Sequence, residues 1–449
     1  MEYIKESNSG MTLVIGQWAL VIRHWMGCLI LIGFISSCSV SKQISKQAGT
    51  ILLNDTAIST GHIGISIYEP ATDTYWYNYN ATKYFIPASN TKLFALYAGM
   101  KYLGDSLAGL RYQIKGDSTV IEPTGDPTFL LSEFKNQPTL NFLKKQKYIY
   151  LSNAFLYNDF LGNGWAWNDY KESYMAQRSS FPIYGNIIKS TLISPDSINI
   201  YPKFYQKQTA VMEELKNGFE VVKGFEDNHF LFIKGNEKSK EVPFRPTIAD
   251  IQLLLEDTLK AKLGLDWSKY NKPGTLIIHS QPSDSLFKPM MHRSDNFFAE
   301  QTLLMASNEH LGYMSDAKII DTLLKTDLKD IPQRPKWVDG SGLSRYNLFT
   351  PQSFVYILNK TKNEFGWNRI KNILPTGGKG TLSSYYRKDS SFIYAKTGTL
   401  SNNCALSGYL ITKKGKLLIF SVLANNYMTG ATPVRRAVEK FLLAIRENY

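Results

Sequence analysis

The sequence has few of the residues that build metal sites or disulfide frameworks. Its 449 residues include only three cysteines, Cys28, Cys38 and Cys404, too few for a fold held together by disulfides. The six histidines form no His-Glu-x-x-His motif and no Cys/His pairing at zinc spacing. We therefore expect neither a metal site nor a cofactor.

Basic residues are numerous, but no block of the chain concentrates them. Lys and Arg number 51 against 38 Asp and Glu, a net charge of +13, without a basic stripe, internal repeat or low-complexity tract. This pattern argues against a nucleic-acid-binding module. It is compatible with a general attraction to anionic polymers of the cell envelope, and more readily with a compositional bias that carries no function. Hydrophobic residues make up 43% and charged residues 20%, which is typical of folded globular domains.

The N-terminal region predicts export and lipid attachment. A cationic pair at 23–24 precedes an apolar run at 25–34, about half of the roughly twenty residues that span a bilayer. This arrangement is typical of a signal peptide, here residues 1–37. The ending Ile-Ser-Ser-Cys resembles the lipobox of bacterial lipoproteins, in which Cys38 would be lipidated. The alternative, a membrane anchor at 11–35, would place two basic side chains inside the bilayer.

Hydrophobic periodicity predicts an α/β fold with a mainly antiparallel sheet. Alternating residues indicate a hairpin at 62–79, and an apolar helix follows it directly. A second hairpin, with strands at 407–412 and 417–424, precedes a helix at 434–445. Between the two hairpins, the region 106–244 has short strands and many turns.

This change of pattern predicts an interrupted domain. We expect a signal peptide at 1–37, a first part of the main domain at 38–105, an insertion at 106–244 and a second part at 245–449. An amphipathic helix at 247–262 would open the second part.

Ser89 and Lys92 begin the apolar helix and are the first chemical motif. Residues three apart on a helix are neighbours, so the lysine amine can reach the serine hydroxyl. A serine is a poor nucleophile until a base removes its proton, and burial lowers the pKa of a lysine enough to make it that base. Ser-x-x-Lys spacing recurs elsewhere in the chain, so this pair is not specific by itself.

Two further motifs follow in a fixed order. Ser294-x-Asn296 comes 205 residues after Ser89, and Lys396-Thr397-Gly398 comes 102 residues after Ser294. Ser-x-Asn also recurs in the chain, whereas Lys-Thr-Gly occurs once. Together the three motifs form the set used by penicillin-binding proteins and class A β-lactamases.

The chain resembles the class C low-molecular-mass penicillin-binding proteins, a family of D-Ala-D-Ala carboxypeptidases and endopeptidases. The resemblance covers nearly all of the sequence after the signal. Further stretches that look like family signatures are Gly-Asp-Pro-Thr at 125–128, Gly-Trp-Ala-Trp-Asn-Asp at 164–169, Asp-Gly-Ser-Gly-Leu-Ser-Arg at 339–345 and Ala-Lys-Thr-Gly-Thr-Leu at 395–400. The resemblance implies a β-lactamase/transpeptidase-like sandwich, which is an antiparallel sheet with helices on both faces. This sandwich would carry an inserted mostly-β domain.

The chemistry and the resemblance together imply a role for each motif residue. Ser89 would attack the carbonyl between two D-alanines of a peptidoglycan stem peptide, with Lys92 as the base. Ser294 would relay a proton to the leaving amine, its hydroxyl held by Lys92 and Lys396. Asn296 would hydrogen-bond the peptide amide of the substrate.

The third motif would hold the end of the substrate. Lys396 and Thr397 would face its terminal carboxylate, a charge-assisted contact. Gly398 would let the substrate backbone lie against the strand as an added strand. The backbone N–H groups of Ser89 and Thr399 would form the oxyanion hole.

The resemblance further implies a pocket for the stem-peptide side chain near a diamino acid. Asp169 and Arg345 would line it, with Tyr174 a weaker candidate. Cys404 is expected in the core. β-Lactam antibiotics are implied as inhibitors, and the sequence makes no prediction about oligomeric state.

Two other functions remain open from the sequence. A β-lactamase shares the fold and two of the motifs, but it needs a dedicated base for fast deacylation, and no glutamate-bearing loop of that kind stands out. A catalytically silent penicillin sensor or envelope-binding lipoprotein would usually show a lost motif residue or several membrane spans, and neither is present. We favour the peptidase, on the periplasmic side of the cell envelope and anchored to its membrane by lipid.

Substitution Cys38→Ser tests the lipid anchor. Without a thiol to acylate, the protein should leave the membrane fraction and appear in the soluble fraction after cell lysis, because stable anchoring requires acyl chains. Continued retention in the membrane fraction would favour an uncleaved anchor instead.

Overall fold

A five-stranded antiparallel sheet, in the order β14-β15-β16-β1-β2, forms the centre of the main domain in the computed structural model. Its strands are β1 (His62–Glu69), β2 (Thr74–Tyr79), β14 (Ile393–Leu400), β15 (Asn403–Ile411) and β16 (Leu417–Asn425). The structure describes residues 40–152, 159–195, 197–212, 215, 217–266 and 275–449. The predicted signal peptide and Cys38 lie outside them.

Both faces of this sheet are covered, which explains its buried strands. β1 alternates in sequence like a half-exposed strand, yet all of its residues except His62 are buried. Gly64 lies on the face that is covered by Phe85 and Pro351, where a Cβ would come within 3 Å of both side chains. The alternation therefore reflects small residues under a covering layer rather than exposure to solvent.

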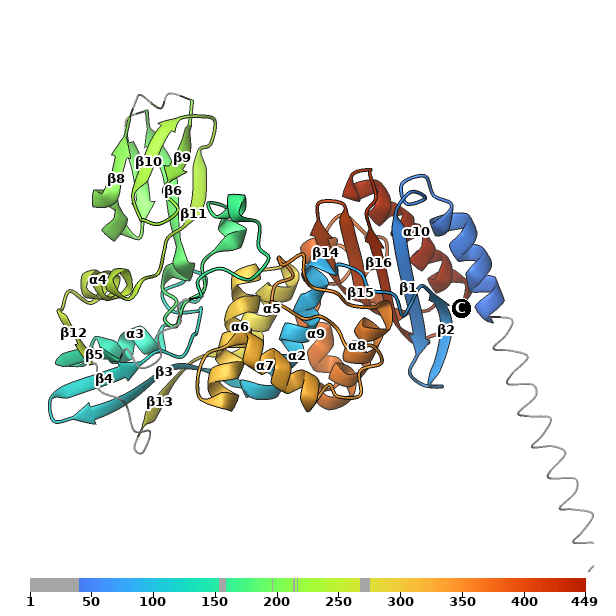
Figure 1. Cartoon of the computed structure of the whole chain (residues 1–449), viewed down its shortest axis with the longest axis horizontal. Helices are drawn as coiled ribbons and strands as arrows, with labels where there is room; N and C mark the ends of the chain where they lie inside the picture. Colours follow the sequence, from blue (N-terminus) through green and yellow to red (C-terminus); the bar gives the residue numbers. More distant parts are fainter. Residues whose placement is uncertain (1–39, 153–158, 196, 213–214, 216, 267–274) are drawn as a thin grey trace, which may run out of the picture.

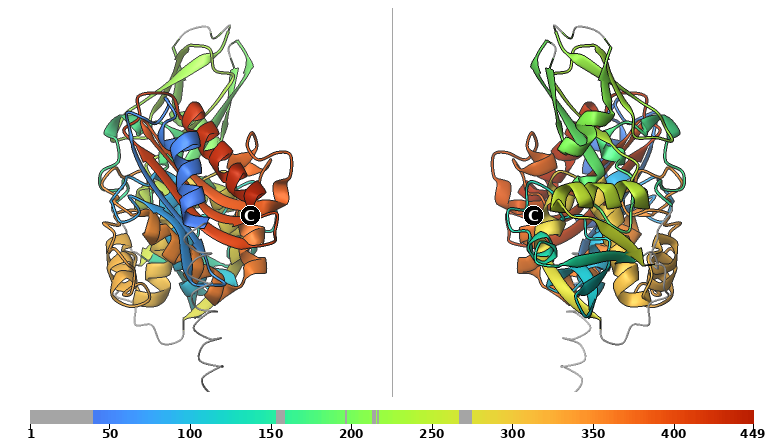
Figure 2. Two further views of the ribbon diagram at one scale, coloured as in Figure 1. Left: turned by 90° about the vertical axis from the view of Figure 1, so that its right-hand side faces the viewer. Right: turned by 90° about the vertical axis from the view of Figure 1, so that its left-hand side faces the viewer.

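The covering helices complete a three-layer sandwich (Figure 1). On one face α10 (Ala431–Asn448) packs beside the N-terminal helical segment that includes η1 (Ala48–Leu53), as Figure 2 shows. On the other face lie α2 (Lys92–Tyr102), α5 (Ser283–His292), α6 (Asn296–Leu311), α7 (Asp316–Lys325), α8 (Pro351–Phe365) and α9 (Trp367–Ile373). The predicted sandwich is confirmed.

The inserted region contains three small sheets and its own core. The sheets are β12-β5-β4-β3-β13, β11-β6-β7 and β8-β10-β9. The elements are β3 (Ser106–Lys115), β4 (Ser118–Glu122), α3 (Pro138–Leu143), β5 (Tyr148–Ser152), β6 (Ile187–Ser194), β7 (Ser197–Tyr201), β8 (Thr209–Val211), β9 (Phe219–Lys223), β10 (Phe230–Lys234), β11 (Ser239–Pro243), α4 (Ile248–Leu259), β12 (Leu263–Asp266) and β13 (Leu276–Pro282). Phe219, Phe230 and Phe244 are among its fully buried side chains.

Strand pairing moves the end of this region beyond the predicted boundary at 244. β12 pairs with β5, and β13 pairs with β3, so both belong to the insertion although they follow residue 245. The helix α4, predicted at 247–262, packs into the same core through Ile251, Leu254 and Leu255. The inserted region therefore extends to about residue 282. Periodicity along the chain identifies strands but does not show which distant strand each one pairs with.

No helix within the described residues is both long and apolar enough to cross a membrane. The remaining helical elements are short 3-10 turns, several of which position site residues.

The crossing of α2 over α5 and α6 depends on a glycine, and a substitution there tests the packing. A Cβ on Gly99 would lie 2.6 Å from Phe287 and 2.7 Å from Thr302. Gly99→Ala should lower the free energy of unfolding by about 1–3 kcal/mol through overpacking, measured by urea denaturation. Gly49→Ala is the matched control, because nothing lies within 4 Å of its Cβ and alanine favours helices. Equal effects of the two changes would contradict this packing.

Candidate active site

Ser89 lies in a 3-10 turn, η2 (Ala88–Thr91), and α2 begins three residues later at Lys92. The predicted first helical turn is thus a 3-10 turn. Ala88 has a φ of 48°, a left-handed conformation that costs energy in a residue with a side chain. Asn90 Nδ2 donates to Ser407 Oγ on β15 at 2.7 Å, which ties the turn to the sheet. These contacts fix Ser89 beside the edge of the sheet.

The buried side chain of Lys92 has three hydrogen-bond acceptors around Nζ. Ser89 Oγ is 2.9 Å away, Asn296 Oδ1 2.6 Å and the carbonyl oxygen of Ser341 2.7 Å. The amide and carbonyl oxygens can only accept, so they hold two N–H groups. In a neutral amine the third direction is the lone pair, which is then aimed at Ser89 Oγ. This geometry suits a base that removes the serine proton.

Burial is the main reason that the pKa of Lys92 falls to about 8. The carboxylates of Asp339, Glu300 and Asp295 act in the opposite direction and partly stabilise the charged form. At pH 7.5 roughly a quarter of such a lysine is neutral, against about 0.1% at the usual pKa of 10.5.

Lys396 on β14 is also fully buried and reaches the second motif. Its Nζ donates to Ser294 Oγ at 2.8 Å and to the Thr397 carbonyl at 2.7 Å. Burial, followed by the charge of Lys92, lowers the pKa of Lys396 well below its usual value. The sequence predicted that both lysines hold the Ser294 hydroxyl. In the structure Lys396 contacts it, while Lys92 makes the three other contacts described above.

Asn296 is the first residue of α6, whose N-terminus is capped by Asp295 through a 2.9 Å bond from Phe298 N. While Asn296 Oδ1 accepts from Lys92, its Nδ2 donates to the Tyr174 carbonyl at 2.9 Å. The carboxamide is therefore held between the base and a segment of the inserted region. Its predicted bond to the substrate amide stays a prediction.

Two glycines allow the chain to close around Ser89. A Cβ on Gly398 would lie 2.6 Å from Pro87 O and 3.0 Å from Ser89 N. Gly342 has a φ of 83°, and its Cβ would lie 1.9 Å from Ala88 O. The close neighbour of Gly398 in the structure is the serine turn. Its predicted role beside the substrate backbone stays a prediction.

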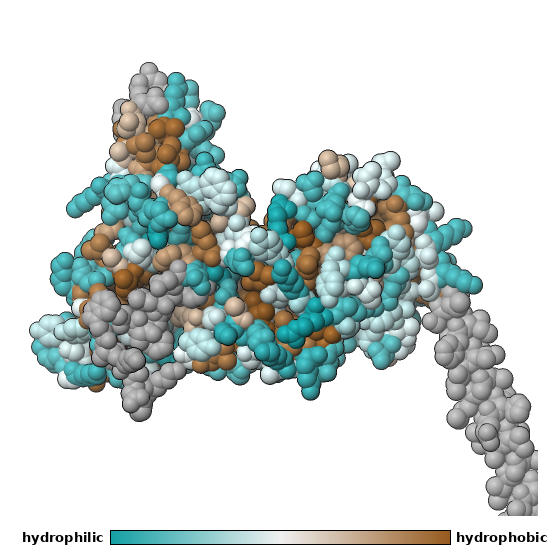
Figure 3. Space-filling view, in the orientation of Figure 1, coloured by the Kyte–Doolittle hydropathy of each residue, from teal (hydrophilic) through white to brown (hydrophobic). Residues whose placement is uncertain are grey.

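Ser89 lines a pocket of about 430 Å³ between the inserted region and the end of the main sheet. The surface is hollowed between these two parts in Figure 3. Residues from both parts line it: Ser89, Gly164, Trp165, Ala166, Asp169, Tyr174, Met175, Asn296, Gly342, Leu343, Arg345, Thr399, Leu400 and Ser401. The structure thus brings six of the residues named from the sequence to one pocket: Ser89, Asp169, Tyr174, Asn296, Arg345 and Thr399.

Asp169 and Arg345 give this pocket charges of both signs. Asp169 ends the 3-10 turn η3 (Trp167–Asp169), and Arg345 Nη1 donates to the Ser401 carbonyl at 3.4 Å. Burial and the adjacent Asp169 carboxylate raise the pKa of Tyr174 to about 12, so its hydroxyl stays protonated at neutral pH. The pocket can pair with a ligand group that carries both an ammonium and a carboxylate.

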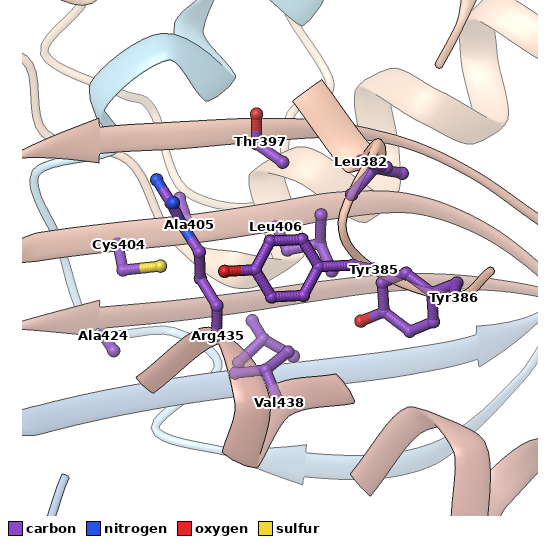
Figure 4. A pocket seen from close by; sticks show the side chains of 11 residues that line it. Leu382, Tyr385, Tyr386, Thr397, Cys404, Ala405, Leu406, Ala424, Arg435 and Val438 are labelled. Atoms are coloured by element: carbon purple, nitrogen blue, oxygen red, sulfur yellow. The ribbon is translucent and has the colours of Figure 1, made fainter. Parts of the chain in front are cut away.

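Thr397 lies at a second, smaller pocket of about 20 Å³ behind β14, together with Cys404 and Arg435 (Figure 4). In this view its hydroxyl is directed away from Arg435. Arg435 donates to the Thr399 hydroxyl, and Cys404 is buried in the core as predicted. The predicted contact of Thr397 with a substrate carboxylate stays a prediction.

The sequence did not identify the groups behind the base. Asp339 accepts from the backbone N–H of Gly342 at 2.8 Å and of Ser344 at 2.7 Å, which shapes the loop that carries Ser341. Trp165 Nε1 donates to the same carboxylate at 3.0 Å. The stretch 339–345 stood out in the sequence. Its hydrogen bond with Lys92, however, is made by the backbone carbonyl of Ser341, and every residue has such a carbonyl, so the sequence could not identify this contact.

A serine and a lysine at the start of a buried helix, facing a second lysine on an edge strand, define the class of active-serine enzymes that form an acyl-enzyme. The chain belongs to the D-Ala-D-Ala carboxypeptidase 3 (S13) family, whose sequence model matches residues 45–443. The predicted family is confirmed.

Similar proteins support this assignment. D-alanyl-D-alanine carboxypeptidase DacB of Haemophilus influenzae is 23% identical over 405 residues, covering 79% of this chain and 83% of the relative. Carboxypeptidase DacB of Mycolicibacterium smegmatis is 30% identical over 176 residues, covering 36% and 38%. The crystal structure of penicillin binding protein 4 from Haemophilus influenzae has a TM-score of 0.70 at 18% identity, covering 90% of this chain and 99% of the other.

The rate of acylation should follow the protonation of Lys92. Only the neutral amine accepts a proton, and its pKa is about 8, so the rate should fall nearly tenfold for each pH unit below 8 and level off above it. Stopped-flow acylation by a fluorescent penicillin between pH 5.5 and 9.5 measures this profile.

Lys92→Ala should abolish acylation while circular dichroism shows a folded protein. A flat profile, or acylation of the alanine variant, would remove Lys92 from the role of base.

Proposed function

We propose that this protein is a serine-type D-Ala-D-Ala carboxypeptidase or endopeptidase. It cleaves peptidoglycan stem peptides through an acyl-enzyme on Ser89. The observation that carries the proposal is the 2.9 Å contact between Ser89 Oγ and the buried Lys92 Nζ in a member of this peptidase family. Family membership favours the peptidase over both the β-lactamase and the silent binding protein.

The reaction would proceed in two stages. In the first, Ser89 Oγ bonds to the carbonyl carbon of the penultimate D-alanine while its proton passes to Lys92. Ser294, held by Lys396, would give its hydroxyl proton to the leaving amine and regain one from the protonated Lys92, so terminal D-alanine departs and Lys92 is neutral again. In the second stage, water attacks the ester and restores the Ser89 hydroxyl. The N–H groups of Ser89 and Thr399 would stabilise the oxyanion in both stages.

Substrate selection would occur in the 430 Å³ pocket. The terminal carboxylate would meet Lys396 and Thr397 at β14. Farther along the stem peptide, a diamino acid would place its ammonium near Asp169 and its carboxylate near Arg345.

Slow deacylation of a β-lactam adduct also fits the pocket. Among the described residues that line it, Asp169 is the only acid, and no glutamate stands there to activate water. A structure of the Haemophilus influenzae penicillin binding protein 4, complexed with a β-lactam, has a TM-score of 0.65 to this chain at 17% identity. We propose that β-lactams inhibit this protein by acylating Ser89.

We further propose a location on the periplasmic side of the envelope, with a lipid on Cys38 as the anchor. The sequence ending Ile-Ser-Ser-Cys supports this, and the substrate class requires access to the cell wall.

Intact-mass spectrometry with benzylpenicillin tests the function directly. The wild-type protein should gain one stoichiometric adduct that persists for minutes or longer, because no glutamate is among the described residues that line the pocket. Ser89→Ala, which removes only the hydroxyl oxygen, should gain none.

Other results would contradict the proposal. Destruction of the drug without a lasting adduct would mean a β-lactamase, and neither adduct nor turnover would mean a silent binding protein.

A further inference from the structure

Glu300 is close to the base Lys92 but is not among the residues that line the 430 Å³ pocket. It is fully buried on α6, four residues after Asn296, so the two side chains share one face of the helix. Its Oε1 accepts the backbone N–H of Ser341 at 2.7 Å. The carbonyl of that same residue accepts from Lys92 Nζ at 2.7 Å. A single residue therefore connects the carboxyl group of Glu300 to the base.

The loop around Ser341 depends on contacts of this kind for its position. Glycines flank Ser341 on both sides, and glycine backbone is intrinsically the least restricted. Gly340 sits directly on α6, where a Cβ would lie 2.5 Å from the Ala299 carbonyl oxygen. The hydrogen bond from Ser341 N–H to Glu300 therefore forms at the place where the backbone of the 339–345 loop touches the backbone of α6.

The charges around Glu300 come from three other segments. Arg178 of the inserted region lies 3.4 Å from its Oε2 and also pairs with Asp316 of α7, while Asp339 comes from the loop. Burial, together with the charge of Asp339, raises the pKa of Glu300 to about 7, and Arg178 opposes this rise. At pH 8, where Lys92 titrates, most of the Glu300 carboxyl is ionised.

The charges around Lys92 include Glu300 itself. Glu300, Asp339 and Asp295 all favour its protonated form, and burial opposes it. Lys396 lies near enough for the charge of Lys92 to lower its pKa. Glu300 accepts from the backbone N–H of Ser341, whose carbonyl binds the base, while Asp339 accepts from the Ser341 hydroxyl at 3.4 Å.

We propose that Glu300 is a positioning residue for acylation: it holds Ser341 so that the Ser341 carbonyl orients the Lys92 amine, and its negative charge sets the pH at which that amine becomes a base. The inference rests on the proposed roles of Ser89 and Lys92. Glu300 touches neither substrate nor reacting atoms, so it acts only through Ser341 and through its charge.

The pH profile of acylation by a fluorescent penicillin separates these effects. Glu300→Gln keeps an oxygen for the Ser341 N–H but removes the charge, so the midpoint of the profile near pH 8, where the wild-type carboxyl is ionised, should move to lower pH by about half a unit. The plateau rate should stay within about threefold of wild type. Glu300→Ala also removes the hydrogen bond and should lower the plateau rate about tenfold or more.

Glu309→Gln is the matched control, because Glu309 lies on the same helix and pairs with Arg111 at 2.6 Å without contacting Ser341. It should leave the profile unchanged. Superimposable profiles for wild type and Glu300→Gln, or equal shifts for both glutamine variants, would overturn the inference. If Glu300→Ala does not fold, the glutamine variant decides alone. Failure of the wild type to form any Ser89 adduct would instead overturn the proposed function, and this inference with it.

Discussion

This structure depends on one constraint: the amine of Lys92 is buried, and the described groups that contact it are all uncharged. Removing a charged ammonium from water is costly, and at Lys92 that cost appears as a pKa near 8. Three acceptors from distant parts of the chain surround Nζ: Ser89, Asn296 and the Ser341 carbonyl. The fold has to bring a helix start, a second helix start and a loop to one point, and it has to keep them there.

Close backbone packing maintains this arrangement. Gly342 and Gly398 approach the serine turn more closely than any side chain would allow, and Gly340 does the same against α6. Each contact joins two segments that are far apart in sequence, so the site is rigid only when the whole main domain is folded. The strained φ of 48° at Ala88 persists because these neighbours determine it.

The inserted region forms part of the active site. Its Trp165 donates to Asp339, its Arg178 pairs with Glu300, and the Tyr174 carbonyl accepts from Asn296. The same region supplies Asp169 to the pocket. The pocket and the surroundings of the base are therefore coupled physically, because one segment, residues 159–178, contributes to both.

The sequence by itself determined the layers of the fold and the three motifs, because periodicity and motif order are local properties of the chain. Sequence could not place the end of the insertion at about 282, since β12 and β13 pair with strands more than a hundred residues earlier. Nor could it show that Lys396 donates to the Ser294 hydroxyl while Lys92 contacts other groups, or that Glu300 reaches Lys92 through the backbone of Ser341. Those features are decided by which distant backbone groups come into contact, and only the tertiary structure fixes that.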